Sequence, residues 1–395
     1  RSMKKIAVSA AVLLLSAQGA VSWDRTFGSD LPEQAFFSLV TEDGGMLTCG
    51  VFIIDVSYSI VSSEGAGGVD CMLVRTDSEG NTLWEGDYYS GPWPDLAVAG
   101  IQSDDGCFVL AGVTTTMEEG QQNWIFKVAD GGEVLWESSP GTDFDDWTYD
   151  MTMTSEGSFI IAGYVDSLSG EGPVISLLKI DGEGEELWSR QYGRYGTGMA
   201  EAVFERDDGH LMVCGNVEIQ ETGLSVPFLM SAGPGGDPDW FATFDSTEGN
   251  CYSLDMSAVN DGTIMLAGYV ETAMGDYDVW IGRMTMNGEP AGEWSFGGEK
   301  DDMAFSTAPC PRGMVVAGST DSDPAKRSDL LLMGVSPEGE LLWSATHGGP
   351  GNEGAENIEP LPSGGFVVSG YTSSRGAGDT DIWVLEVDCS GEPAD

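Results

Sequence analysis

The chain has 395 residues, of which 41% are hydrophobic, and this is enough to build a sizeable core. Its 65 acidic and 16 basic residues give a formal net charge of −49. This charge makes a nucleic acid or an anionic membrane a poor partner, whereas cations and basic surfaces remain possible partners. Only two histidines are present, and neither lies in a motif typical of a catalytic triad or a zinc site.

The N-terminus has the three parts of a secretory signal peptide. A lysine pair supplies the charged start, residues 6–15 are apolar, and residues 16–22 are mostly small. The apolar run is too short to span a bilayer, and no later stretch reaches that length. We predict that residues 1–22 are removed, with a cut after Gly19 as the alternative, and that the first two residues are read-through from upstream. The protein would then be exported, to the periplasm or the outside of a bacterium.

The rest of the chain is an internal repeat. Each unit holds four short apolar runs bounded by Gly, Pro, Asp or Ser, which indicates strands joined by hairpins. The units are about 50 to 60 residues long, as expected for a repeat architecture. Tryptophans mark the same place in seven successive units: Trp23, Trp84, Trp136, Trp188, Trp240, Trp294 and Trp343.

In chain order, residues 23–27 form an isolated strand, and 35–39 begin the first strand of the first unit. That unit carries an insertion at 53–68. The last unit ends with the run Asp381–Asp388 and has no tryptophan strand after it. The N-terminal strand can supply what the last unit lacks.

Seven units of four strands give about 28 strands, too many for an open sheet, whereas radial repetition of blades avoids this problem. We predict an all-β fold, a seven-bladed β-propeller of four-stranded antiparallel blades, as a single domain over residues 23–395. The N-terminal strand completes the C-terminal blade and closes the ring, which removes exposed sheet edges.

A small residue recurs at the same position in each unit. It lies in the first strand, and about fifteen positions later comes a glycine that we expect to end the second strand. Cys49 and Cys214 precede this glycine where other units have alanine or serine, so a free buried thiol fits there. A Cys49–Cys71 disulfide is the alternative, and none of the seven cysteines has metal-type spacing.

Two segments carry a family resemblance. The pattern Asp-x-Trp-Val-Leu-x-Val-Asp-x-x-Gly at 381–391, with Gly-Glu-Leu-Leu-Trp-Ser-x-x-x-Gly-Gly at 339–349, resembles the β-propeller repeat of secreted bacterial proteins (SBBP type). The resemblance covers residues 23 to 391. It departs at 226–230, which lacks the leading Asp, and at the first-unit insertion. It implies a propeller fold and export, and no particular activity.

Five units carry an acid two positions before the small residue of the first strand. In a closed propeller these carboxylates would surround one mouth of the central channel, and carboxylate oxygens are the ligands that calcium prefers. We therefore predict an acidic rim that holds a hard cation such as calcium, with no other cofactor. The alternative is that each acid caps its own loop. The acids are Glu33, Asp95, Asp146, Asp302 and Glu353.

Two tryptophans stand outside the repeat pattern, in loops that lead into first strands. Acids lie beside both of them, so the two loops combine aromatic and charged groups. We predict that these residues contact a ligand: Trp93, Asp95, Asp143, Asp146 and Trp147.

Together these features favour a secreted, non-enzymatic propeller that acts as a binding or scaffold module for a protein, a glycan or a cation. We expect a monomer without nucleic-acid binding or a membrane span. The alternative is an extracellular hydrolase or lyase that uses carboxylates at the central channel. A compact pocket with carboxylates of shifted pKa would favour the enzyme, and a merely acidic face would favour binding.

Overall fold

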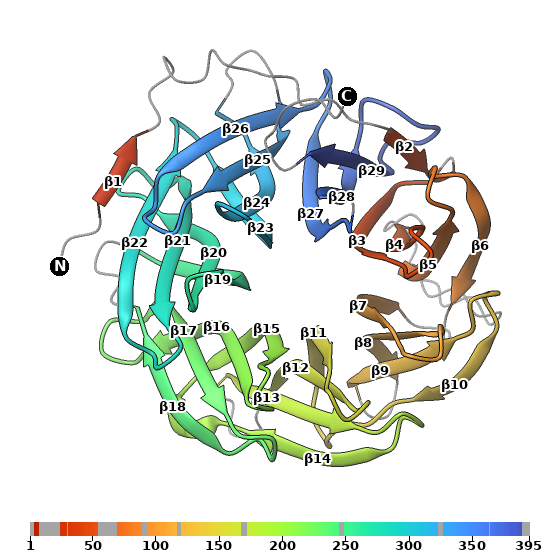
Figure 1. Cartoon of the computed structure of the whole chain (residues 1–395), viewed down its shortest axis with the longest axis horizontal. Coiled ribbons are helices and arrows are strands. Elements are labelled where there is room, and N and C mark those ends of the chain that lie inside the picture. The colour runs from red at the N-terminus through yellow and green to blue at the C-terminus, as the bar shows by residue number, and fades with distance from the viewer. Residues whose placement is uncertain are drawn as a thin grey trace. The chain divides into compact units, whose positions relative to one another are not determined.

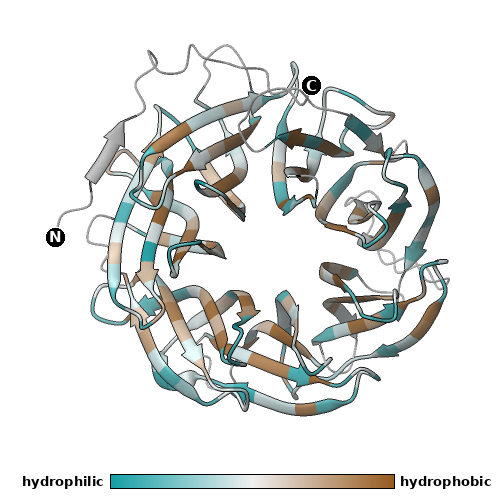
Figure 2. Ribbon diagram, in the orientation of Figure 1, coloured by the Kyte–Doolittle hydropathy of each residue, from teal (hydrophilic) through white to brown (hydrophobic). Residues whose placement is uncertain are grey.

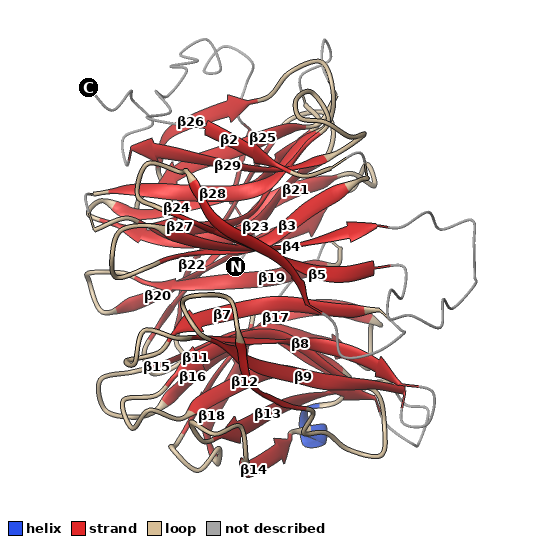
Figure 3. Cartoon of the chain, turned by 90° about the vertical axis from the view of Figure 1, so that its right-hand side faces the viewer, coloured by secondary structure: helices blue, strands red, loops and turns tan. Residues whose placement is uncertain are grey.

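The computed structural model describes residues 4–7, 24–29, 31–53, 69–88, 94–116, 120–166, 172–244, 249–322, 327–362 and 364–388. Over these ranges the chain forms 29 strands and one short 3-10 helix, η1 (Gly193–Tyr195) (Figure 3). No helix in the described part of the chain is long and apolar enough to cross a membrane.

The strands form seven sheets, here called blades 1 to 7, and except for β1 and β2 the neighbours within a sheet are consecutive along the chain (Figure 1). Blade 1 contains β3 (Glu33–Val40), β4 (Met46–Ile53), β5 (Val69–Thr76) and β6 (Thr82–Tyr88). Blade 2 contains β7 (Asp95–Gln102), β8 (Phe108–Thr116), β9 (Gly120–Val128) and β10 (Val134–Ser138). Blade 3 contains β11 (Asp146–Met153), β12 (Phe159–Asp166), β13 (Pro173–Ile180) and β14 (Glu186–Gln191). Blades 4 and 5 are β15 (Gly198–Glu205), β16 (Leu211–Ile219), β17 (Leu224–Ala232) and β18 (Pro238–Thr243); and β19 (Cys251–Ala258), β20 (Thr263–Glu271), β21 (Tyr277–Thr285) and β22 (Pro290–Gly297). Blade 6 is β23 (Asp302–Cys310), β24 (Gly313–Thr320), β25 (Asp329–Val335) and β26 (Leu341–His347), and blade 7 contains β27 (Glu353–Pro360), β28 (Gly365–Thr372) and β29 (Asp381–Asp388).

The fourth strand of blade 7 comes from the other end of the chain. It is β2 (Asp24–Phe27), which pairs antiparallel with β29, Asp24 opposite Leu385 and Phe27 opposite Ile382. The predicted completion of the last blade by the N-terminal strand is therefore confirmed. The fold class is also confirmed: the protein is a seven-bladed β-propeller of four-stranded antiparallel blades.

One sheet has an additional strand. β1 (Lys4–Ala7) pairs in parallel with β22, Lys4 opposite Trp294 and Ala7 opposite Gly297, so the sheet of blade 5 has five strands. The outermost strand of a sheet offers unpaired backbone groups, which explains why it accepts another strand. β1 lies within the stretch that the sequence predicts as a signal peptide.

The chain divides into two compact units. One is Leu31–Glu218 with Leu229–Phe241, which includes blades 1 to 3, and the other is Arg1–Asp30, Ile219–Phe228 and Ala242–Asp395, which includes blades 5 to 7. In the first, Leu73 of blade 1 packs in one buried cluster with Phe108 of blade 2. In the second, Leu332 and Val368 do the same for blades 6 and 7. The hydrophobic residues lie along the strands and the hydrophilic ones gather at the turns (Figure 2).

Every first strand contains a β-bulge at the same place, directly after the small residue. A bulge leaves one residue outside the ladder and re-aims its side chain. The small residue lies opposite the glycine of the second strand, as in the Ala97–Gly112 pair. The bulged residues are Phe36, Val98, Tyr149, Glu201, Leu254, Phe305 and Glu356.

The glycine opposite the small residue does not end the second strand, contrary to our expectation. In blade 2, β8 continues for four residues beyond Gly112. The glycine is needed because the bulged strand comes very close. A Cβ at Gly112 would lie 1.8 Å from the carbonyl oxygen of Leu96, and one at Gly163 would lie 1.7 Å from that of Trp147. Close approach of two backbones is a usual reason for glycine inside a strand.

Four of the tryptophans that mark the repeat pack on the next blade. Trp84 Nε1 of blade 1 donates a hydrogen bond to the carbonyl oxygen of Asp130 in a blade 2 turn, at 2.7 Å. A Cβ at Gly132 of that turn would be 3.4 Å from the Trp84 ring. Gly132 has a positive φ, a conformation that favours glycine because it has no Cβ. Three further pairs repeat this contact: Trp136 with Gly184, Trp188 with Gly236, and Trp294 with Gly339.

Candidate functional site

The five acids of the predicted rim are the first residues of β3, β7, β11, β23 and β27, and all five are buried. Glu353 shows the local arrangement. Its Oε2 accepts the backbone N–H of Gly349 at 2.8 Å, and its Oε1 accepts the hydroxyl of Thr372, the opposite residue on β28, at 3.0 Å. Asp302 accepts Gly298 N–H at 2.7 Å and the hydroxyl of Thr320.

These acids therefore cap the loop before their own strand wherever the contacts are resolved. Among the described residues, no group of three His, Cys, Asp or Glu side chains is placed to hold one metal ion. Calcium binding by Glu33, Asp95, Asp146, Asp302 and Glu353 stays a prediction.

Asp146 departs from the arrangement in blades 6 and 7. Its Oδ2 accepts the backbone N–H and the hydroxyl of Thr142, at 2.6 and 3.0 Å. Opposite Asp146 on β12, however, stands Val165, where blades 6 and 7 have a threonine. Within the described part of the chain, Asp146 Oδ1 accepts no hydrogen bond. One carboxylate oxygen is thus left for another partner.

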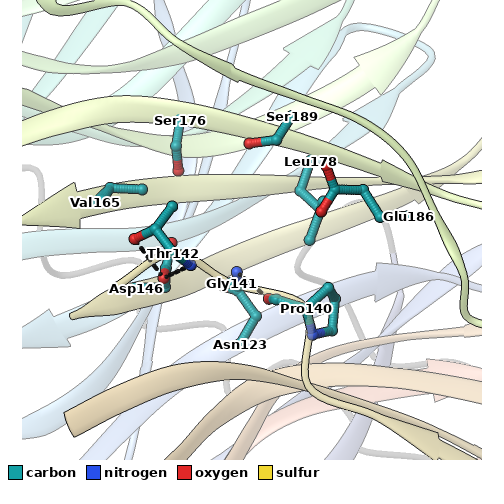
Figure 4. A pocket seen from close by; sticks show the side chains of 10 residues that line it. All are labelled: Asn123, Pro140, Gly141, Thr142, Asp146, Val165, Ser176, Leu178, Glu186 and Ser189. Carbon is teal, nitrogen blue, oxygen red and sulfur yellow. Dashed lines mark hydrogen bonds between the residues drawn. The ribbon is translucent and has the colours of Figure 1, made fainter. Parts of the chain in front are cut away.

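A pocket of about 150 Å³ opens in front of Asp146 (Figure 4). It lies between blades 2 and 3 and is bounded by the loop 139–145 and by strands β9 and β11 to β14. The residues that line it are Asn123, Pro140, Gly141, Thr142, Asp146, Val165, Ser176, Leu178, Glu186 and Ser189. The set combines two carboxylates, three hydroxyls and one amide with three apolar side chains.

Two interactions fix the loop that forms the floor of the pocket. Asn123 Nδ2 donates to the carbonyl oxygen of Pro140 at 3.0 Å, and Asn123 Oδ1 accepts the Thr148 hydroxyl at 2.8 Å. Gly141 lets the loop pass close, because a Cβ there would lie 2.1 Å from Gln122 Oε1. By contrast, the hydroxyls of Ser176 and Ser189 bond to none of the described residues.

The pocket is electrostatically negative. None of the residues that line it is basic. Burial raises the pKa of Asp146 above its usual value; the hydrogen bonds from Thr142 oppose this shift, and the charges of Asp145 and Glu186 add to it. The cost of holding the charged form would fall if a cation entered the pocket.

The other predicted ligand contacts are dispersed. Asp143 is exposed on the loop beside the pocket. Asp95 is fully buried at the start of β7. Trp93 lies outside the described residues. Trp147 follows Asp146 on β11, and side chains alternate along a strand, so it points to the opposite side from the pocket. The structure thus brings only Asp146 into the pocket and places Asp143 at its edge.

On that opposite side, Trp147 is part of an aromatic cluster. Its ring lies 6.4 Å from that of Tyr164 with an angle of 5° between the planes, and 6.3 Å from that of Tyr149. The Tyr149 hydroxyl approaches Met199 Sδ of blade 4 at 3.6 Å. Glu201, the bulged residue of β15, accepts a hydrogen bond from Asn216 Nδ2 at 3.3 Å.

Burial raises the pKa of Glu201 to about 8, and the Asn216 hydrogen bond only partly offsets this. A carboxyl that is protonated at neutral pH is a feature of functional sites. Sequence reasoning missed Glu201, Tyr149 and Tyr164. Glu201 could have been found by reading one position beyond the small residue of each unit, where this unit alone, apart from the last, has a carboxylate.

No family model matches the chain, and no curated protein matches it. Among solved structures it is similar to an ulvan lyase of a new polysaccharide lyase family, with a TM-score of 0.57, 10% identity and coverage of 94% of this chain and 97% of that one. It is also similar to the Pan2 WD40 domain of Neurospora crassa (0.55, 9%, 93% and 96%). A third is the β-propeller domain of the Trilobed protease of Pyrococcus furiosus (0.51, 11%, 93% and 96%). At these identities the likeness shows the propeller fold alone.

Proposed function

We propose that this protein is an exported binding module that holds a partner by a cationic group placed in the pocket between blades 2 and 3. The observation that carries the proposal is the free oxygen of Asp146. Blades 6 and 7 use both oxygens of the equivalent acid internally, whereas Val165 leaves Asp146 Oδ1 without a hydroxyl partner.

The size of the pocket limits what enters it. The volume of the pocket is about 150 Å³. Drug-sized ligands use about 300 to 1,000 Å³. The pocket therefore fits the end of a side chain, such as a lysine ammonium or an arginine guanidinium. The rest of the partner would lie outside it.

The lining matches such an end group. An ammonium has three donors and needs acceptors, and Asp146 Oδ1 and the Ser176 and Ser189 hydroxyls can accept. Glu186 is exposed at the edge of the pocket and adds negative charge. The net charge of −49 also speeds the approach of a basic partner.

The test uses a lysine pentapeptide as probe and its fully acetylated form as the neutral match, with isothermal titration calorimetry at physiological ionic strength. Asp146→Asn keeps an acceptor for Thr142, and Ser176→Ala with Ser189→Ala removes two acceptors. We expect each variant to weaken binding about tenfold, because hydrogen bonds to a charged group are worth about 1.5 to 3 kcal/mol.

The control is Asp302→Asn, which changes the net charge equally at an acid whose two oxygens are already used. If Asp302→Asn weakens binding as much as Asp146→Asn, the attraction is only general and the pocket is not the site. Equal affinity for the acetylated peptide would also contradict the proposal.

One observation favours the alternative, an extracellular hydrolase or lyase. Glu201 has a pKa of about 8 and lies close enough to Tyr164 to influence its hydroxyl, so Glu201 could donate a proton to a leaving group. Incubation with acidic and neutral polysaccharides, followed by reducing-end and unsaturated-product assays, distinguishes the two. Turnover that Glu201→Gln abolishes would establish the enzyme and displace the binding proposal.

A further inference from the structure

The three rings of the aromatic cluster in blade 3 lie close enough together to contact one small group. The centroids of Trp147, Tyr149 and Tyr164 are 6.0 to 6.4 Å apart, so they form a nearly equilateral triangle. Trp147 and Tyr164 are nearly parallel, and Tyr149 is tilted by 48° and 44° from them. A group about 3.5 Å above the centre of the triangle would be about 5 Å from each centroid, within the roughly 6 Å range of cation–π attraction. All three rings are half-buried, so each keeps some exposed surface.

The next blade adds a methionine and a carboxyl group to the rings. Met199 Sδ contacts the Tyr149 hydroxyl at 3.6 Å, and Asn216, opposite Met199, holds the carboxyl of Glu201 at 3.3 Å. Glu201 is close enough to Tyr164 to contribute to the raised pKa of its hydroxyl, after burial and the charges of Asp166 and Asp145. The bulge in β15 places Glu201 outside the ladder and lets it point away from its own sheet.

The charges around the cluster point to a cation. Each charged group that shifts the pKa of Tyr164 is acidic. The faces of aromatic rings are also negative and attract cations. Rings offer no lone pairs in the way that a metal ion requires, and they suit a cation with an apolar surface and weak hydration. Alkylated ammonium groups have both properties, and recognition of quaternary ammonium is the usual function of such aromatic sites.

We propose that Trp147, Tyr149 and Tyr164 of blade 3, together with Glu201 of blade 4, form a site for an alkylated ammonium ion. The site is separate from the Asp146 pocket, because it lies on the other side of β11. It goes beyond the proposed function, which concerns the pocket alone.

Binding at this site releases a proton. In the empty site Glu201 is mostly protonated at pH 7, because its pKa is about 8. A cation beside it favours the charged form and lowers the pKa. Asn216 on its own blade donates a hydrogen bond to Glu201, and Tyr164 on blade 3 lies close enough to interact with it electrostatically; the carboxylates of Asp145 and Asp166 act on the same tyrosine. Affinity should therefore rise with pH up to about pH 8 and level off above it.

Blade 5 provides a matched comparison. Tyr252 and Tyr269 stand where blade 3 has Trp147 and Tyr164, with ring centroids 5.0 Å apart. The bulged residue of the next blade is Phe305 in place of Glu201. Tyr277 adds a third ring beside Tyr269. The blade 5 rings have no carboxyl from the bulge of the next blade, so Tyr252→Ala controls for the loss of a half-buried aromatic ring.

The probe is choline, and its neutral match is 3,3-dimethylbutan-1-ol, which has the same shape without the charge. Calorimetric titration at fixed ionic strength should give saturable choline binding to the full chain and no binding of the alcohol. Trp147→Ala and Glu201→Gln should each weaken it about tenfold, while Tyr252→Ala and Asp146→Asn leave it unchanged. Titration in two buffers of different ionisation enthalpy should show close to one proton released at pH 7, and none in Glu201→Gln.

Thermal unfolding of each variant shows whether it is folded, and Gln at 201 keeps the acceptor for Asn216. Three results overturn the proposal: no choline binding at tens of millimolar, equal binding of the neutral alcohol, or choline affinity unchanged in both Trp147→Ala and Glu201→Gln. Loss of choline binding in Asp146→Asn alone would move the cation site to the pocket and also overturn it. Failure of the pentapeptide test with choline binding intact would refute only the pocket function.

Discussion

Asp255 links two blades and should make their interface sensitive to pH. Its Oδ2 accepts the backbone N–H of Thr307 in blade 6 at 2.7 Å and the Ser306 hydroxyl at 3.0 Å, while Oδ1 accepts Met256 N–H at 2.7 Å. Burial raises the pKa of this carboxyl to about 6, although all of these hydrogen bonds favour the ionised form. Desolvation therefore outweighs three donors at this position.

The sign and the size of the effect follow from the two pKa values. The unfolded value is 3.8 and the folded value is about 6, a shift of about two units, and each unit is about 1.36 kcal/mol. A raised folded pKa contributes stability that is present below pH 4 and lost as the pH rises through 6. Asp255 should cost at most about 3 kcal/mol at pH 7 relative to its protonated form.

Asp255→Asn removes this dependence, since asparagine stays neutral and its oxygen can still accept from Thr307. We expect the free energy of unfolding of the variant, relative to the original protein, to improve by up to about 3 kcal/mol between pH 4 and pH 7. Urea unfolding at four pH values measures this difference, and the other carboxylates cancel in it.

Asp105→Asn is the control of opposite sign. The hydrogen bonds from Lys127 and Ser103 hold the pKa of Asp105 well below its usual value, so its stabilising effect is present at pH 7 and lost on acidification. Asp105→Asn should therefore be most harmful at neutral pH. A difference between Asp255→Asn and the original protein that stays constant from pH 4 to pH 7 would refute the reasoning.

Two further predictions concern stability. A chain that begins at Leu31 lacks β2 and its four residue pairs with β29. We expect its free energy of unfolding to fall by about 2 to 4 kcal/mol and calorimetry to show a lower melting temperature. An unchanged melting temperature would show that β2 does not stabilise blade 7. Cys49 Sγ lies 3.4 Å from Cys71 Sγ, and both thiols are free and buried. Cys49→Ala should cost less than about 1.5 kcal/mol in urea unfolding under reducing conditions, because four other blades have alanine at this position; a loss of several kcal/mol without reductant would reveal a disulfide.

The blade pattern could be predicted because each of its elements is local. A tryptophan, a turn glycine and a run of alternating apolar residues are enough to define a strand and its hairpin. The completion of blade 7 by β2 could be predicted by counting strands. The last unit had only three strands, and the N-terminal strand belonged to no unit. The fifteen-residue interval between Ala97 and Gly112 also proved to be a direct cross-strand pair. The position of that glycine within β8 was wrong, because the bulge that requires it is a feature of the neighbouring strand.

The sites could be predicted only in part. The repeat located Asp146 correctly at the entrance to its strand, but its free oxygen depends on Val165, a residue nineteen positions later that faces it across the sheet. Trp147 was identified without its partners, because Tyr164 lies on the second strand and Glu201 on the next blade. Such contacts become visible only when strand register is known to the residue.

In a repeat protein the equivalent positions of the other blades act as an internal standard. A buried acid at the start of a first strand is a structural cap in blades 6 and 7, so burial alone gives no reason to assign it a function. The acid of blade 3 differs because Val165 removes one of its partners and a pocket opens at the same place. Among the bulged residues, Glu201 differs because it lies close to Tyr164 of the preceding blade. Function is best sought where a blade keeps the shared backbone but its side-chain contacts differ from those of the other blades. The two such places found in this protein, the Asp146 pocket and the aromatic cluster near Glu201, lie on opposite sides of β11.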